Sequence, residues 1–275
     1  MQGRVYPVVV CYNGGMDIGY ALVTGASGGI GAEFARQLAG RGWGLVLVAR
    51  SGDALEALAV ELRAACGVDV RVVVADLSAA GAAVALMREL DGVRLDLLIN
   101  NAGFGAFGLF GEIDRERQRE MVMLNIGALV ELAHLCLGPM VERGAGAVVN
   151  IASVAAFQPI PYMTVYAATK AFVLDFSRGL HAEYKAKGVH VMAVCPGATR
   201  TAFFERAGGA SFAAQARMQT VEQVVAEGLR GLDRKKAVVV CGWLNRATTM
   251  VGGLVPAGPK TAVLAKVMRK LPKSS

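Results

Sequence analysis

Seven short runs of mainly apolar residues, separated by longer amphipathic stretches, constrain the fold of this chain more than any other feature. The runs fall at residues 21–24, 45–49, 70–76, 95–100, 147–153, 189–195 and 237–241. A strand that is apolar at consecutive positions is buried on both faces, which is typical of a parallel sheet covered by helices. Right-handed crossovers through the amphipathic stretches then predict an α/β fold with a doubly wound, parallel, seven-stranded sheet.

Composition argues against several other classes of protein. Apolar residues make up 54% of the chain, yet none of the apolar runs reaches the roughly 18 uninterrupted residues that a membrane span needs. The five cysteines are far apart and lack metal-ligand spacing, so we interpret them as buried thiols of a reducing compartment and expect no metal site. The net charge is +7, but no basic stripe interleaved with aromatic residues occurs in the body, so we expect no nucleic-acid partner.

A glycine-rich segment follows the first apolar run. TGASGGIG, residues 24–31, joins that strand to a predicted helix and contains Gly25, Gly28, Gly29 and Gly31. Glycines at such a junction allow a tight turn and a close approach to a pyrophosphate, and the N–H groups of the helix start favour its charge. The literal G-x-G-x-x-G pattern is absent, but the placement predicts a dinucleotide site in a Rossmann-like fold.

The end of the second apolar run indicates which dinucleotide binds. A carboxylate at this place accepts the ribose 2′-hydroxyl of NAD and repels the 2′-phosphate of NADP. The chain has no acid here and instead carries Arg50 and Ser51. A cation and a hydroxyl favour NADP(H), although Arg50 can also be a solvated loop residue.

Further landmarks lie at the ends of later runs. NNAG (residues 100–103) ends the fourth run, Ser153 ends the fifth, and Pro196 and Gly197 follow the sixth, while YAATK (residues 166–170) lies in a helical stretch. With TGASGGIG, these motifs resemble the short-chain dehydrogenase/reductase family, in its shorter single-domain branch, over residues 20–241. Stretches such as NNAGFGAFG and CPGATRTAF are similar to bacterial members of unassigned activity that are distantly akin to 3-oxoacyl and 17β-hydroxysteroid reductases.

Tyr166 and Lys170 are the residue pair on which the chemistry depends. Residues four apart share a helix face, so the ammonium can lie close to the phenol. A phenol with a pKa near 10 exchanges protons poorly at neutral pH, and a nearby cation stabilises phenolate. We therefore expect Lys170 to lower the pKa of Tyr166. The plain alternative is that Tyr166 half-buries its ring and Lys170 extends into water.

The resemblance implies a role for each matching residue. Tyr166 would be the acid/base, Lys170 would also bind the nicotinamide ribose, and Ser153 would hold the substrate carbonyl. Asn125 matches an asparagine that sustains a water-linked proton path. Asp76 matches an adenine contact and Thr201 a carboxamide contact. The residues expected to bind NADP(H) are Gly25, Ser27, Gly29, Ile30, Gly31, Arg50, Ser51, Asp76, Leu77, Asn101, Ala102, Gly103, Tyr166, Lys170, Pro196, Gly197, Thr199 and Thr201.

Apolar side chains near the expected site suggest the substrate. Residues 201–218 supply Phe203, Phe204 and Phe212, and Phe157 follows Ser153. Such a wall argues for a small hydrophobic carbonyl compound, such as a fatty-acyl, steroid-like or polyketide-like ketone. The expected substrate contacts are Ser153, Phe157, Phe203 and Phe204. These phenylalanines can equally pack lid helices onto the body.

The C-terminal segment offers three interpretations. Residues 260–273 place apolar residues at helical spacing between cations, as in a helix that lies on an anionic membrane. The same stripe can dock on the body or on a second subunit. By the resemblance, helices at residues 114–138 and 164–187 would build a homodimer or homotetramer. We expect a cytoplasmic protein, with peripheral membrane contact through this tail as one alternative.

These expectations divide the chain into three parts. Residues 1–15 form a loose N-terminal extension, residues 16–245 a Rossmann-type NADP-binding catalytic domain, and residues 246–275 a basic amphipathic tail. The expected activity is NADPH-dependent reduction of a ketone, reversible as alcohol oxidation. The alternative is a non-catalytic NADP-binding sensor or scaffold, which the presence of both Tyr166 and Lys170 disfavours.

Overall fold

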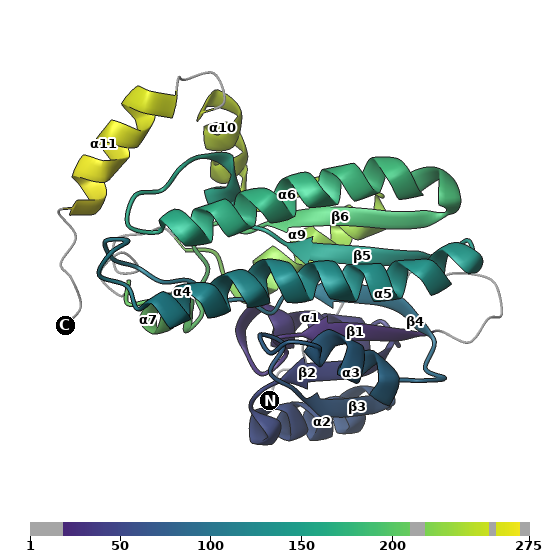
Figure 1. Cartoon of the computed structure of the whole chain (residues 1–275). Coiled ribbons are helices and arrows are strands. Elements are labelled where there is room, and N and C mark those ends of the chain that lie inside the picture. The colour runs from purple at the N-terminus through teal and green to yellow at the C-terminus, as the bar shows by residue number, and fades with distance from the viewer. Residues whose placement is uncertain (1–18, 210–217, 253–256, 270–275) are drawn as a thin grey trace.

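The computed structural model describes residues 19–209, 218–252 and 257–269, and its centre is a seven-stranded sheet (Figure 1). All neighbouring strands are parallel, in the order β3-β2-β1-β4-β5-β6-β7. This confirms the doubly wound α/β fold that the apolar runs predict. The strands are β1 (Tyr20–Thr24), β2 (Gly44–Ala49), β3 (Val70–Val74), β4 (Leu95–Asn100), β5 (Gly146–Ile151), β6 (Val189–Cys195) and β7 (Val238–Val240).

Helices cover both faces of the sheet, as its doubly apolar strands require. One face packs against α1 (Gly29–Ala39), α2 (Gly52–Cys66) and α9 (Val221–Asp233). The other packs against α3 (Ala82–Glu89), α5 (Leu129–Glu142) and α6 (Thr164–Tyr184). Phe34 and Leu55 lie in the core of the first face, and Leu86 and Leu132 in that of the second. The sequence pattern therefore builds two apolar layers on one sheet.

A continuous helix crosses the second face. It runs from α4 (Arg115–Val122) through a π-helical turn, η1 (Met123–Ala128), into α5. Its length and composition would suit a membrane span, and it is the one such helix among the residues that the structure describes. However, Leu132, Cys136 and Met140 are buried in the core of this face, so we assign it as a core helix.

The start of α9 illustrates how local sequence sets an element boundary. The Thr220 side chain accepts a hydrogen bond from the backbone N–H of Gln223, and the Gln223 side chain accepts one from the N–H of Thr220. This capping box satisfies two N–H groups that the helix leaves without partners. The pair thus fixes the start of α9 at Val221.

Two helices follow the last strand. They are α10 (Trp243–Gly252) and α11 (Ala257–Arg269), which projects away from the sheet in Figure 1. The expected boundary at residue 246 falls within α10. The expected N-terminal extension, residues 1–15, lies outside the described residues.

The strand order places a ligand crevice. The chain builds outward from β1 to β3, then returns to β4 on the other side of β1. In doubly wound sheets, ligands bind beyond the carboxyl ends of the strands at such a reversal. The loops after β1 and β4 are therefore the first place to look for a site.

Candidate active site

The loops that carry the expected site residues all lie at the carboxyl ends of the strands. The glycine-rich turn follows β1, Arg50 and Ser51 follow β2, and Asp76 and Leu77 follow β3. Residues 101–103 follow β4, Ser153 follows β5, and residues 196–201 follow β6. Because the strands are parallel, these loops share one edge of the sheet. Sequence positions far apart are thus gathered at one crevice.

Close packing explains the glycines after β1. Gly25 and Gly29 have positive φ angles of 65° and 57°, a conformation that side chains with a Cβ disfavour. A Cβ on Gly31 would lie 2.4 Å from the Gly25 carbonyl oxygen. The first turn of α1 begins at Gly29, so its free N–H groups form an anion-binding helix start. Ser27 and Ile30 belong to the same turn and are half-buried.

Asn101 braces this turn from the neighbouring loop. Its Nδ2 donates to the carbonyl oxygens of Thr24 at 2.9 Å and Gly25 at 3.3 Å. The backbone N–H groups of Asn101 and Ala102 both donate to Thr24 Oγ1. The structure therefore directs the Asn101 amide to the glycine turn, which it holds in shape.

Arg50 and Asp76 form the outer end of the crevice. Their closest charged atoms are 4.0 Å apart, and the Arg50 side chain is 72% exposed. Asp76 accepts hydrogen bonds from the side chain and backbone of Ser78, which lower its pKa, and the Arg50 charge adds to this effect. Arg50 is thus accessible to an anionic group, and Asp76 remains a carboxylate beside it.

Tyr166, Lys170 and Ser153 converge at the other end. Tyr166 and Lys170 are one turn apart on α6, and both are buried. Lys170 Nζ lies 5.9 Å from the centre of the Tyr166 ring and donates to the Ile151 carbonyl oxygen at 2.8 Å. The Ser153 side chain lies close enough to the Tyr166 hydroxyl to lower its pKa. The alternative of a lysine extended into water is therefore wrong for this structure.

Burial shifts the two titratable groups in opposite directions. It raises the pKa of Tyr166 to about 12, because desolvation disfavours phenolate more than the Ser153 hydrogen bond favours it. Burial also lowers the pKa of Lys170 to about 8. The expected lowering of the Tyr166 pKa is thus wrong here, because desolvation outweighs the Ser153 hydrogen bond, the one influence that lowers this pKa. At neutral pH the phenol is protonated and can serve as a proton donor.

Asn125 lies in the π-helical turn η1 and is fully buried. Its Nδ2 donates to the Phe104 carbonyl oxygen at 3.0 Å and to Thr169 Oγ1 at 3.1 Å, and its Oδ1 accepts from the Phe104 N–H. Thr169 in turn donates to the Tyr166 carbonyl oxygen. A Cβ on Gly103 would lie 2.8 Å from Asn125 Oδ1. Asn125 therefore joins the loop after β4 to the helix that carries Tyr166.

The loop after β6 is paired with the segment before α9. The Gln219 N–H donates to the Ala198 carbonyl oxygen at 2.9 Å, and the Arg200 N–H donates back to the Gln219 carbonyl oxygen at 3.0 Å. Thr199 lies between these bonds and donates its hydroxyl to the Gly197 carbonyl oxygen. Thr201 faces the glycine turn, since a Cβ on Gly29 would lie 3.1 Å from its Cγ2. The loop after β6 thus reaches the glycine turn at Thr201.

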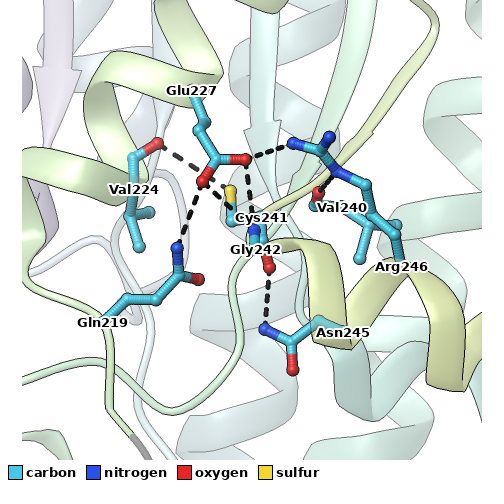
Figure 2. Close-up of polar contacts among 8 residues, drawn as sticks. All are labelled: Gln219, Val224, Glu227, Val240, Cys241, Gly242, Asn245 and Arg246. Atoms are coloured by element: carbon cyan, nitrogen blue, oxygen red, sulfur yellow. Dashed lines mark hydrogen bonds and ion pairs between the residues drawn. The ribbon is translucent and has the colours of Figure 1, made fainter.

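Glu227 of α9 connects the segment before α9 to the start of α10 (Figure 2). Its carboxylate accepts from Gln219 Nε2 at 3.2 Å, from the Gly242 N–H at 3.1 and 3.2 Å, and from Arg246. The sequence analysis did not single out Glu227. A lone glutamate within a helix gives no signal of its own, because its partners lie in two other segments, before α9 and at the start of α10.

Asn245 lies directly behind residues 196–197. Its Nδ2 donates to the Cys241 carbonyl oxygen at 2.7 Å, and a Cβ on Gly197 would lie 2.3 Å from that Nδ2. Glycine is therefore required at position 197 for α10 to approach the loop. The loop is clamped between the crevice and the first turn of α10.

Aromatic side chains cover Tyr166 on one side. The Phe203 ring, on α7 (Phe203–Arg206), lies 5.2 Å from the Tyr166 ring between centroids, and Phe204 packs on Phe203. Phe104 and Ile160 belong to the same apolar cluster. A Cβ on Gly105 would lie 2.7 Å from Phe203 Cζ, a close approach that the sequence analysis missed.

Phe157 is not part of this wall. It ends the short helix η2 (Val154–Phe157) and packs in a different cluster, with Leu129 and Val173, beneath the Arg178 guanidinium. It follows Ser153 in the chain, but its apolar neighbours belong to this cluster and not to the one around Tyr166. Phe212 lies outside the described residues. No cluster of metal-ligating side chains occurs among the residues that the structure describes.

Comparison with known proteins identifies the family. The model of the short chain dehydrogenase family matches residues 19–210, and the chain belongs to this family. A very-long-chain 3-oxoacyl-CoA reductase from Anas platyrhynchos is 39% identical over 183 residues, which cover 64% of this chain and 58% of that protein. The aligned region therefore spans less than two thirds of that relative's length.

Solved structures extend the match to most of the chain. A short-chain dehydrogenase from Sphingobium yanoikuyae in complex with NADPH has a TM-score of 0.80 and 37% identity, covering 94% of this chain and 98% of that chain. A bulky-bulky ketone specific alcohol dehydrogenase from Comamonas testosteroni has a TM-score of 0.75 and 34% identity, covering 88% and 97%. The resemblance seen in the motifs is confirmed.

Proposed function

We propose that this protein reduces a ketone with NADPH, reversibly, and that Tyr166 supplies the proton. The observation that carries the proposal is the convergence of Tyr166, Lys170 and Ser153 beside a glycine-rich anion site at one sheet edge. Membership of the short chain dehydrogenase family supports a redox role. A binding protein would have no need for a buried lysine beside a buried phenol.

The residues present fit NADP(H). Gly28 faces open space and α1 begins at Gly29, so the turn offers free backbone N–H groups to a pyrophosphate, and the exposed Arg50 guanidinium suits a 2′-phosphate. The Sphingobium relative was solved with NADPH. We propose that Asp76 and Leu77 lie at the adenine, residues 101–103 at the adenosine ribose, Lys170 at the nicotinamide ribose, and residues 196–201 at the nicotinamide. The cofactor would supply the hydride to the carbonyl carbon.

The protein's own residues handle the carbonyl oxygen. Ser153 donates a hydrogen bond to it, which stabilises the negative charge that develops as the carbon is reduced. Tyr166, protonated at neutral pH, then gives its proton to the same oxygen and yields the alcohol. Lys170 favours the resulting phenolate by its charge. Asn125 holds the loop and helix at the spacing these contacts need, and we propose that it also lines the proton return path.

We propose a hydrophobic, lipid-like ketone as substrate. Phe203 and Phe204 form an apolar wall at Tyr166. The relatives are named for a very-long-chain 3-oxoacyl-CoA and for bulky-bulky ketones. An apolar pocket of this kind gains affinity with each buried methylene, by about 0.8 kcal/mol. The Phe203 contact with Tyr166 supports a wall beside the carbonyl that Tyr166 would protonate.

A series of ketones with growing chain length and ring size tests the proposal, with loss of NADPH absorbance as the readout. We expect kcat/KM to rise with apolar size, severalfold for each methylene that enters the pocket. Phe203→Ala should flatten this rise, whereas Phe157→Ala, which alters a ring outside the wall, should preserve its slope. Tight NADPH binding without turnover on any ketone would instead favour a sensor.

We further propose that the protein is a cytoplasmic homodimer or homotetramer. The support is a surface formed by α4 and α6, which are in contact and expose Val122 and Phe172. Phe172 stacks on Phe176 one turn along α6. Exposed aromatic and aliphatic residues on two packed helices are typical of subunit contacts.

A further inference from the structure

An apolar stripe runs along the solvent side of α10. Trp243, Ala247, Met250 and Val251 are all exposed, at the spacing that places residues on one helix face. Trp243 is 71% exposed and Met250 77% exposed. Large apolar side chains gathered on one exposed face mark a surface that meets another apolar phase or partner.

The second helix, α11, divides its apolar residues between two faces. Met268 is only 3% exposed, and Leu264 one turn before it is half-buried. Val263 and Val267 lie on the other side, and Val263 is 64% exposed. The helix thus turns one stripe inward and keeps a second stripe outward. The inward stripe agrees with docking on the body of the protein. The outward stripe leaves an apolar face for a membrane or a second subunit.

The two helices are joined at their ends. Lys260 Nζ donates to the Gly252 carbonyl oxygen at 2.8 Å, which links the start of α11 to the end of α10. A cation at the C-terminus of α10 also complements its dipole. The pair can therefore present its outward residues as one element.

The charge of this surface distinguishes two possible partners, a second copy of the chain and an anionic lipid bilayer. After Gly252 the sequence has five cationic residues and no acidic one. A second copy placed face to face on the helix pair would bring like charges together. An anionic lipid surface would instead attract these cations while the apolar stripe enters the acyl boundary. The charge pattern thus favours an anionic bilayer over a second copy.

We propose that α10 and α11 together form an interfacial element that docks on an anionic lipid bilayer. The element contacts the candidate active site through α10. This helix packs on η2, which directly follows Ser153, and its Asn245 lies against Gly197. Docking would hold the crevice at a lipid surface. The docking itself does not depend on the reaction, but the supply of an apolar ketone from the bilayer rests on the proposed function.

Sedimentation with vesicles tests the docking on the full chain. Phosphatidylcholine vesicles are compared with vesicles that also contain phosphatidylglycerol. We expect binding to the anionic vesicles at least tenfold tighter, and weaker binding as salt is raised, because salt screens the charges. Equal binding to both vesicle types, or binding to neither, would overturn the proposal.

Trp243 gives a second, spectroscopic readout, since the chain has only two tryptophans. The fluorescence difference between the wild type and Trp243→Phe should shift to the blue with anionic vesicles, and Trp43 should contribute no shift. The double variant Trp243→Ser/Met250→Ser should lose at least tenfold in vesicle affinity. The matched control is Val60→Ser, an exposed apolar position on α2, which should bind like the wild type.

Two outcomes separate this proposal from its alternatives. If the double variant changes the oligomeric state without changing vesicle binding, the stripe is a contact between copies and the proposal fails. Turnover of a short water-soluble ketone is measured in parallel and should be the same in the double variant. Failure of vesicle binding with normal turnover would sink only the docking, whereas normal binding without turnover would sink only the proposed reaction.

Discussion

The environment of each titratable side chain decides its protonation in this molecule, and residue type alone does not. Tyr166 and Lys170 share one buried site, yet burial favours the neutral form of both, which raises one pKa and lowers the other. The sequence indicates this pair, but the prediction made from it took the charge of Lys170 as the dominant influence on the pKa of Tyr166. Desolvation is the larger effect, because it depends on the neighbours that the fold supplies.

At Arg50 the prediction concerns cofactor choice. In the wild type, the Arg50 guanidinium lies 4.0 Å from the Asp76 carboxylate. Arg50→Asp should place a second carboxylate in this region, where it would repel a 2′-phosphate and accept a hydrogen bond from a ribose hydroxyl. We expect the ratio of kcat/KM for NADPH over NADH to fall at least tenfold, or about 1.4 kcal/mol. Arg88→Asp, at an exposed position on α3, is the charge-matched control. An unchanged ratio in Arg50→Asp would remove Arg50 from the cofactor site.

His190 should make stability depend on pH. Burial lowers its pKa to about 4, and its Nε2 is buried without a hydrogen-bond partner among the described residues. The unfolded chain, with an ordinary pKa near 6.5, binds the proton more readily than the folded one. Stability is therefore fully present above pH 6.5 and lost as pH falls toward 4, by at most about 1.4 kcal/mol per pH unit.

Urea unfolding between pH 7 and 4 measures this effect. His190→Leu should show a shallower loss of stability with falling pH than the wild type. His134→Gln changes an exposed histidine on α5 and should follow the wild-type slope. Parallel slopes for all three proteins would mean that other groups govern the acid side of the stability curve.

Among the elements, α9 positions the loop after β6 without touching the crevice. Glu227 connects that loop, through Gln219, to Gly242 and Arg246 at the start of α10. Glu227→Ala should raise KM for NADPH about tenfold and leave kcat within about twofold, because the loss of one such charged acceptor is worth about 1–3 kcal/mol. Glu227→Gln keeps an acceptor for the Gly242 N–H and should restore part of the loss.

A purely structural role for Glu227 predicts a different pattern. The melting temperature would then fall while both kinetic constants of the surviving folded enzyme stayed at wild-type values. Glu183→Ala, at an exposed position near the end of α6, controls for the loss of a surface carboxylate. The comparison of KM with kcat decides between the two roles.

Sequence patterns predicted the elements better than they predicted the contacts between them. Apolar runs located all seven strands, and the glycines after β1 indicated an anion site, because both depend on local chain geometry. The π-helical turn around Asn125 could not be read from the sequence, since it is held by the Phe104 backbone and Thr169. The cluster in which Phe157 packs could not be read from the sequence for the same reason, since it depends on neighbours from other elements.

Over the whole molecule, the surfaces that remain apolar suggest how it assembles. Phe172→Glu, on the α4 and α6 surface, would place a charge in the proposed subunit contact. We expect mass measurements in solution to show a shift from dimer or tetramer toward monomer, with the fold retained by circular dichroism. Val60→Glu on α2 should keep the wild-type mass. A wild-type chain that is already monomeric would contradict the proposed assembly.

The central claim is that the buried Tyr166 hydroxyl delivers the proton to a ketone beside NADPH. The most direct measurement is stopped-flow loss of NADPH absorbance with Tyr166→Phe, alongside NADPH binding by fluorescence. We expect the reduction rate to fall at least a hundredfold, the range that a positioned acid contributes, with NADPH affinity within about threefold of the wild type. A variant that reduces ketones at the wild-type rate while binding NADPH normally would contradict the account.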